Sequence, residues 1–157
     1  MKPSHRLAIV LLSSFVIFIV VLYIYHLSSR ELKILKYESF EIVIQREREN
    51  IINPSKLRVS DRGFIYVKNI TGFHKDISGR AELRAMITIY TADGIKVYSK
   101  LVFLPPYPVT SENQILLLKV PFDLQFRPSP GIYVLKLALI DIATEQMFEK
   151  ETIIMIE

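Results

Sequence analysis

Histidine is the residue type best suited to metal binding or acid–base chemistry, and it is scarce in this sequence. The chain has three histidines, His5, His26 and His74, and no cysteine. Zinc and copper sites need several imidazole or thiolate ligands held close together. His5 and His26 flank a long apolar run at its opposite ends, and His74 stands by itself in a polar segment. The sequence therefore predicts no zinc or copper site.

Carboxylates are the other groups that could do chemistry, and five aspartates fall at or near the expected ends of strands. These are Asp61, Asp76, Asp93, Asp123 and Asp141. Sandwich loops can gather such side chains around calcium, but aspartate is also favoured in turns, and dense Asp-x-Asp spacing is missing. The sequence also lacks a Gly-x-Ser-x-Gly elbow, a phosphate loop and a dinucleotide turn. We expect no catalytic residue, no bound cofactor and no metal.

One apolar, proline-rich segment is the best candidate for a binding site. Its residues are Phe103, Leu104, Pro105, Pro106, Tyr107, Pro108 and Val109. Proline excludes a helix or a central strand here. The segment is predicted either to seal one end of the folded domain as a crossover loop or to present a docking patch to a protein partner.

Alternation of apolar and polar residues predicts the strands that must position these groups. In residues 82–90, Leu83, Ala85, Ile87 and Ile89 share one face, as a half-buried strand requires. Asp93-Gly94 follows, which is a strong hairpin signal. Comparable segments cover residues 39–46, 64–70, 95–103, 114–122, 132–140 and 147–156, with a short extra strand at 56–60. This pattern favours an antiparallel β-sandwich of seven to eight strands.

The run Pro130-Gly131-Ile132-Tyr133, with the alternating strand and Asp-containing turn that follow it to Thr144, has a known counterpart. It resembles the Pro-Gly-x-Tyr strand of immunoglobulin-like and fibronectin type III-like modules. The resemblance covers the last third of the chain and implies an immunoglobulin-like fold. It also implies that Tyr133 is a tyrosine-corner residue whose hydroxyl bonds to nearby backbone. The cysteine pair and core tryptophan of antibody domains are absent.

Residues 7–25 carry no charge, which predicts one N-terminal transmembrane α-helix at residues 7–27. A cleaved signal peptide is the alternative, but the run is long and ends in bulky residues. Tyr23, Tyr25 and His26 are the expected membrane-interface residues. The predicted division is a basic N-terminus at 1–6, the span, a juxtamembrane linker at 28–38 and the β-sandwich at 39–157. The positive charges that flank the run slightly favour a cytoplasmic C-terminal side, whereas the signal-anchor layout favours a single-pass membrane protein whose C-terminal domain is extracytoplasmic.

These patterns predict a non-catalytic, membrane-anchored interaction or accessory subunit of a cell-envelope or membrane protein assembly. Its expected partners are the lipid bilayer and one or more proteins. No nucleic acid is expected, because the formal net charge of +4 is not concentrated in a basic cluster. The alternative is a membrane-tethered ligand-binding or sensory module that uses loops such as residues 71–80 and 105–113. A concave pocket with convergent polar groups would favour that alternative.

Overall fold

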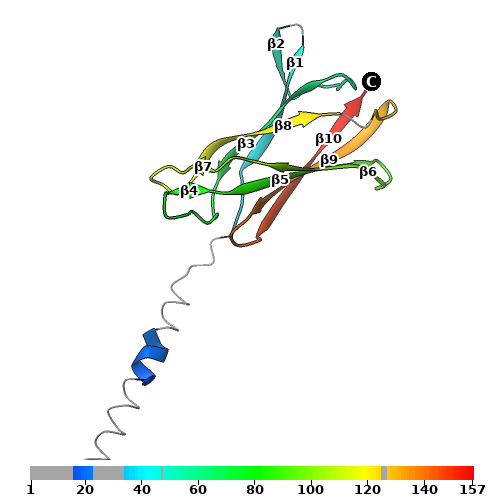
Figure 1. Cartoon of the computed structure of the whole chain (residues 1–157). Coiled ribbons are helices and arrows are strands. Elements are labelled where there is room, and N and C mark those ends of the chain that lie inside the picture. Colours follow the sequence, from blue (N-terminus) through cyan, green and yellow to red (C-terminus); the bar gives the residue numbers. More distant parts are fainter. Residues whose placement is uncertain (1–15, 23–33, 47, 125–126) are drawn as a thin grey trace, which may run out of the picture. The chain divides into compact units, whose positions relative to one another are not determined.

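The computed structural model describes residues 16–22, 34–46, 48–124 and 127–157 (Figure 1). The chain divides into two compact units, Met1–Lys33 and Ile34–Glu157. The second unit contains every named strand.

The first unit corrects the expectation of a transmembrane helix. Its described part, residues 16–22, is helical, with apolar and exposed side chains. Within the described ranges no helix is long and apolar enough to cross a membrane, so the predicted transmembrane helix at 7–27 is wrong. The expected interface residues Tyr23, Tyr25 and His26 lie outside the described residues.

The second unit is built from two antiparallel sheets of four strands each. In the first sheet the order is β2 (Glu49–Ile52), β1 (Ser39–Arg46), β3 (Arg62–Ile70) and β8 (Ile115–Asp123). In the second the order is β10 (Met147–Ile156), β9 (Gly131–Asp141), β5 (Leu83–Thr91) and β6 (Lys96–Phe103). A further pair, β4 (Arg80–Ala81) with β7 (Tyr107–Pro108), lies at the end where β5 begins (Figure 1).

The connectivity of the long strands is immunoglobulin-like. In chain order, the first, second and fifth of them (β1, β3 and β8) share one sheet, and β5, β6, β9 and β10 form the other. The second sheet therefore groups strands from both halves of the sequence, as in immunoglobulin sandwiches whose third and fourth strands join the last two. The expected β-sandwich of immunoglobulin-like fold is confirmed.

The core lies between the two sheets and is built by the predicted alternation. Leu83, Ala85, Ile87 and Ile89 of β5 are at most 1% exposed. They meet the equally buried inner residues of the other sheet, which include Ile44, Ile65, Val67 and Val120. Full burial of one such large aliphatic side chain contributes about 1.5–3 kcal/mol. The packed inner faces of the two sheets thus hold the sandwich together.

Hydrogen bonds fix the chain at both ends of the sandwich. Where the second unit begins, Lys36 and Thr71 exchange two backbone bonds of 3.0 and 2.9 Å. A Cβ on Gly72 would lie 1.9 Å from the carbonyl oxygen of Ile34, so only glycine fits at this contact. At the other end, Leu57 donates to Met155 and accepts from Glu157 at 2.8 and 2.9 Å.

The tyrosine-corner expectation is matched in detail. The Tyr133 hydroxyl, near the start of β9, donates a 2.8 Å hydrogen bond to the Ser129 carbonyl four residues upstream. A second tyrosine works similarly, because the Tyr37 hydroxyl donates to the Leu137 carbonyl at 2.7 Å. Burial raises the pKa of Tyr37, so its hydroxyl stays protonated as a donor.

We predict that Tyr133→Phe lowers the free energy of unfolding by about 1 kcal/mol, because it deletes one hydrogen bond of this kind while keeping the ring. Tyr107→Phe is the matched control and should change stability by less than about 0.5 kcal/mol. Urea unfolding of both variants, followed by circular dichroism, gives the comparison. Equal effects of the two substitutions would contradict a specific role for the Tyr133 hydroxyl.

Candidate functional site

The predicted docking segment divides between the core and the surface. Leu104, Tyr107 and Val109 are partly buried and pack against the core, and Tyr107 also lies in β7. Phe103 is 69% exposed, and Pro105, Pro106 and Pro108 are exposed as well. The segment thus closes one end of the sandwich with three side chains while presenting Phe103 at the edge strand β6.

Phe103 belongs to a larger apolar surface on the side of the second sheet that faces away from the core. Strand register places Met147, Ile140, Arg84 and Phe103 in one row across β10, β9, β5 and β6. We define the outer face by these four residues together with Met86, Leu101, Ile132, Val134, Ile153 and Met155, which point the same way by the alternation of each strand.

Large apolar side chains on the outer face remain open to solvent. The exposed fractions are 40% for Met155, 43% for Leu101, 53% for Ile132, 54% for Met147, 69% for Phe103 and 74% for Ile153. A sheet of four strands with about five outward rows measures on the order of 19 by 30 Å. That area, about 500–600 Å² with the polar side chains included, approaches one side of a protein interface.

A polar row crosses the middle of this surface. It contains Glu151, Lys136, Thr88 and Ser99, which are register neighbours. Lys136 donates to Glu149 at 2.9 Å, and this hydrogen bond raises the pKa of Lys136. The Lys136 ammonium also lies 5.8 Å from the centre of the Tyr90 ring. The charge of Lys136 in this row is thus paired within the sheet.

Arg84 has a different environment in the apolar row. Its guanidinium stacks 4.9 Å from the centre of the Phe103 ring. Its Nε is buried and has no hydrogen-bond partner among the described residues. A buried donor without an acceptor costs about 1–3 kcal/mol, and more when the group is charged.

Three of the five aspartates identified in the sequence accept hydrogen bonds that stabilise turns and loops. Asp141 is fully buried and accepts from the backbone of His74 and Ala143 and from the Thr144 hydroxyl, at 2.7 to 3.1 Å. It therefore joins the β9–β10 turn to the loop after β3. His74 itself is exposed. Asp76 and Asp93 lie in turns, where hydrogen bonds from nearby backbone and hydroxyl groups lower both carboxyl pKa values.

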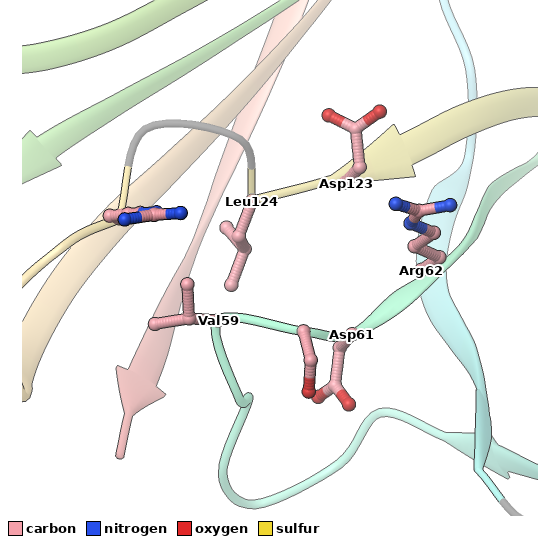
Figure 2. Close-up of a pocket in the computed structure, with 7 residues that line it drawn as sticks. Val59, Asp61, Arg62, Asp123 and Leu124 are labelled. Atoms are coloured by element: carbon pink, nitrogen blue, oxygen red, sulfur yellow. The ribbon is translucent and has the colours of Figure 1, made fainter.

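The remaining two aspartates lie beside a cavity of about 300 Å³, Asp61 directly before β3 and Asp123 at the end of β8. Figure 2 shows apolar Val59 and Leu124 next to charged Asp61, Arg62 and Asp123 there. Asp123 accepts a 2.9 Å bond from the Lys100 ammonium. Within the described ranges, no group of three or more histidine or acidic residues could hold a metal ion.

Asp61 is held by a two-pronged ion pair. Arg46 donates from Nε and Nη2 to its two carboxylate oxygens at 2.9 and 2.6 Å, and the Arg58 amide adds a 2.7 Å bond. Burial alone would raise the pKa of Asp61. The bonds from Arg46 and Arg58 outweigh burial, so the pKa lies below its usual value. Arg46 also donates to the Lys56 carbonyl, which fixes the segment between β2 and β3.

Comparison with known proteins supports the fold but assigns no function. No protein-family model and no curated protein matches the sequence. The C-terminal domain of wzt aligns with a TM-score of 0.50 at 18% identity, covering 78% of this chain and 73% of that one. An immunoglobulin-like protein of Pseudomonas aeruginosa aligns at 0.45, with 10% identity over 81% of this chain and 99% of that chain. A β-glucuronidase of Parabacteroides merdae aligns at 0.35, with 15% identity over 78% and 13%.

The similarity to the wzt domain supports the fold alone, so the candidate site depends on this chain's own residues. Sequence reasoning identified Phe103 but missed the rest of the outer face. A signal was present in residues 132–140, where both alternating sets are mainly apolar. That pattern indicates a strand with two apolar faces, of which a two-layer sandwich buries only one.

We predict that the Arg46–Asp61 pair makes stability depend on acidic pH. Because the folded-state pKa of Asp61 is lowered, its contribution is complete above its unfolded value of about 3.9 and is lost as pH falls through the folded value. Asp61→Asn should therefore melt well below the wild type at pH 7, and the gap should narrow below about pH 4. Melting temperatures from pH 2 to 7 test this. A gap that stays constant across that range would show that the pair does not titrate.

Proposed function

We propose that this chain is a non-catalytic interaction or accessory subunit, which uses the outer face of its immunoglobulin-like sandwich to bind a protein partner. The exposed apolar surface carries the proposal. Six large apolar side chains that are 40% or more exposed gather on this single face. Water exclusion from such a surface favours association, and a rim of charged groups, here including Glu149 and Lys96, is typical of protein interfaces.

The shape and support of this surface favour docking over chemistry. The outer face lies on four hydrogen-bonded strands rather than on loops, so its side chains are presented by a rigid support. Phe103 extends it to the sheet edge, next to the exposed prolines that follow β6. The location of the assembly at the cell envelope, with an extracytoplasmic domain, stays a prediction from the sequence.

The ligand-binding alternative has weaker support. The cavity beside Asp61 is bordered by the start of β3 and the end of β8, and not by the loops at 71–80 and 105–113 that were expected to bind a ligand. Its two carboxylates, Asp61 and Asp123, are already engaged by Arg46 and Lys100. This arrangement favours a structural role for those groups.

Site-specific photo-crosslinking in the native host tests the proposed function. A photoreactive phenylalanine analogue at Phe103 or Ile153 should give discrete adducts with one partner. The same analogue at Leu116, which is 56% exposed on β8 of the other sheet, is the matched control and should give none. Adducts of equal yield from both sheets, or from neither, would contradict the proposal.

The variants Leu101→Glu and Ile153→Glu should abolish the adduct formed at Phe103, because each places a charge within the apolar surface. Since both side chains face solvent, each substitution should change the free energy of unfolding by less than about 0.5 kcal/mol. Thermal melts of the purified variants check that the fold is intact. A persistent adduct in a folded variant would count against the outer face as the docking surface.

A further inference from the structure

The surroundings of Arg84 point to the chemistry of the partner. The side chain projects from the inner strand β5, between Ile140 of β9 and Phe103 of β6. The Phe103 ring lies 4.9 Å from the guanidinium carbon and limits its rotation. Arg84 is thus a cation held in a defined position within an otherwise apolar row.

The sandwich itself provides no counter-ion for this cation. Among the described residues Arg84 makes no ion pair, and its buried Nε has no acceptor. Glu149 lies across the sheet and already forms an ion pair with Lys136. Glu82, two residues before Arg84 in the chain, is exposed and forms no ion pair with it. A cation that lacks a counter-ion among apolar side chains favours a partner that brings an anionic acceptor to its terminal nitrogens.

A carboxylate is the acceptor that fits best. Because the Nε atom is buried, a partner meets the two terminal nitrogens, whose N–H donors can bind the two oxygens of one carboxylate. Apolar neighbours such as Phe103 and Ile140 would exclude water around the pair and strengthen it. Arginines that are surrounded by apolar contacts and shielded from water are frequent energetic centres of interfaces.

The charge of the outer face favours the same partner. Its outward-pointing ionisable side chains are Arg84, Lys96, Lys136, Glu149 and Glu151. Three are cationic and two anionic, and the pairing of Lys136 with Glu149 leaves Arg84 as the cation inside the apolar row. An anionic group flanked by apolar side chains therefore complements the face in both charge and hydrophobicity.

We propose that the outer face binds a polypeptide that places an aspartate or glutamate carboxylate, flanked by apolar side chains, against the Arg84 guanidinium. This proposal rests on the proposed docking function and specifies its partner. The partner is a different polypeptide rather than a second copy of this chain, because two copies of this face, each with three cationic and two anionic side chains, would repel one another.

Peptide selection on the full-length protein tests the proposal directly. A phage-displayed library of random twelve-residue peptides is panned on the immobilised chain, and enriched peptides are synthesised with a fluorescent label. We expect a shared acidic residue with apolar neighbours. Arg84→Gln should weaken binding at least tenfold, as should replacing the peptide's acid by its amide. Arg84→Lys should rescue only part of the loss, because it keeps the charge without the paired donors.

Controls separate this proposal from loss of folding and from failure of the docking function. Arg62→Gln removes an exposed arginine beside the cavity and should leave the peptide affinity unchanged. The melting temperature of Arg84→Gln should stay close to that of the wild type, since the variant removes both an unmet donor and the stacking on Phe103. If Leu101→Glu abolishes binding but Arg84→Gln does not, the face docks partners and the carboxylate inference fails. If neither substitution matters, both proposals fail.

Two further results would overturn the carboxylate inference. Enriched peptides without a shared acid would overturn the carboxylate inference. So would reversible dimerisation in analytical ultracentrifugation that Leu101→Glu disrupts, because the face would then be occupied by a second copy.

Discussion

The register between β5 and β9 is the constraint on which the rest of the structure depends. These two strands are neighbours in the sheet although β6, β7 and β8 lie between them in sequence. Their pairing runs from Leu83 opposite Asp141 to Thr91 opposite Tyr133. A slip of one residue would exchange the inner and outer side chains along a whole strand. Hydrogen bonds anchor this register at both ends, through the buried Asp141 carboxylate and the Tyr133 hydroxyl.

The same register gives the sheet two apolar faces, of which one is buried and the other is exposed. The inner face is covered by the first sheet, and its aliphatic side chains stabilise the fold. On the outer face Arg84, Ile140 and Phe103 come together from three separate strands and remain uncovered within the described unit. The unmet donor of Arg84 lowers stability slightly in the isolated unit, which is the kind of compromise that binding surfaces often contain. The inner side of these strands therefore stabilises the fold, and the outer side is the one proposed to bind a partner.

Local patterns predicted what depends on local sequence. Period-two alternation found the seven long strands, because each has an inner face that must be apolar. The short strand β2 was not predicted, since Glu49 and Asn50 are polar and the strand forms only by pairing with β1. The transmembrane helix was wrong although the apolar run at 7–25 is plain in the sequence. The Arg84 environment could not be predicted, because Phe103 and Ile140 become its neighbours only through tertiary pairing.

The hydrogen bonds at the two ends of the sandwich have a mechanical consequence. The segment joined to Thr71 and the final residues joined to Leu57 lie at opposite ends of the folded unit (Figure 1). Tension between Lys36 and Glu157 would therefore pull β1 and β10 along their lengths. Antiparallel ladder bonds are perpendicular to the strands, so many of them would share that load at once instead of opening one after another. The sandwich should therefore resist extension when it is pulled along the direction of its strands.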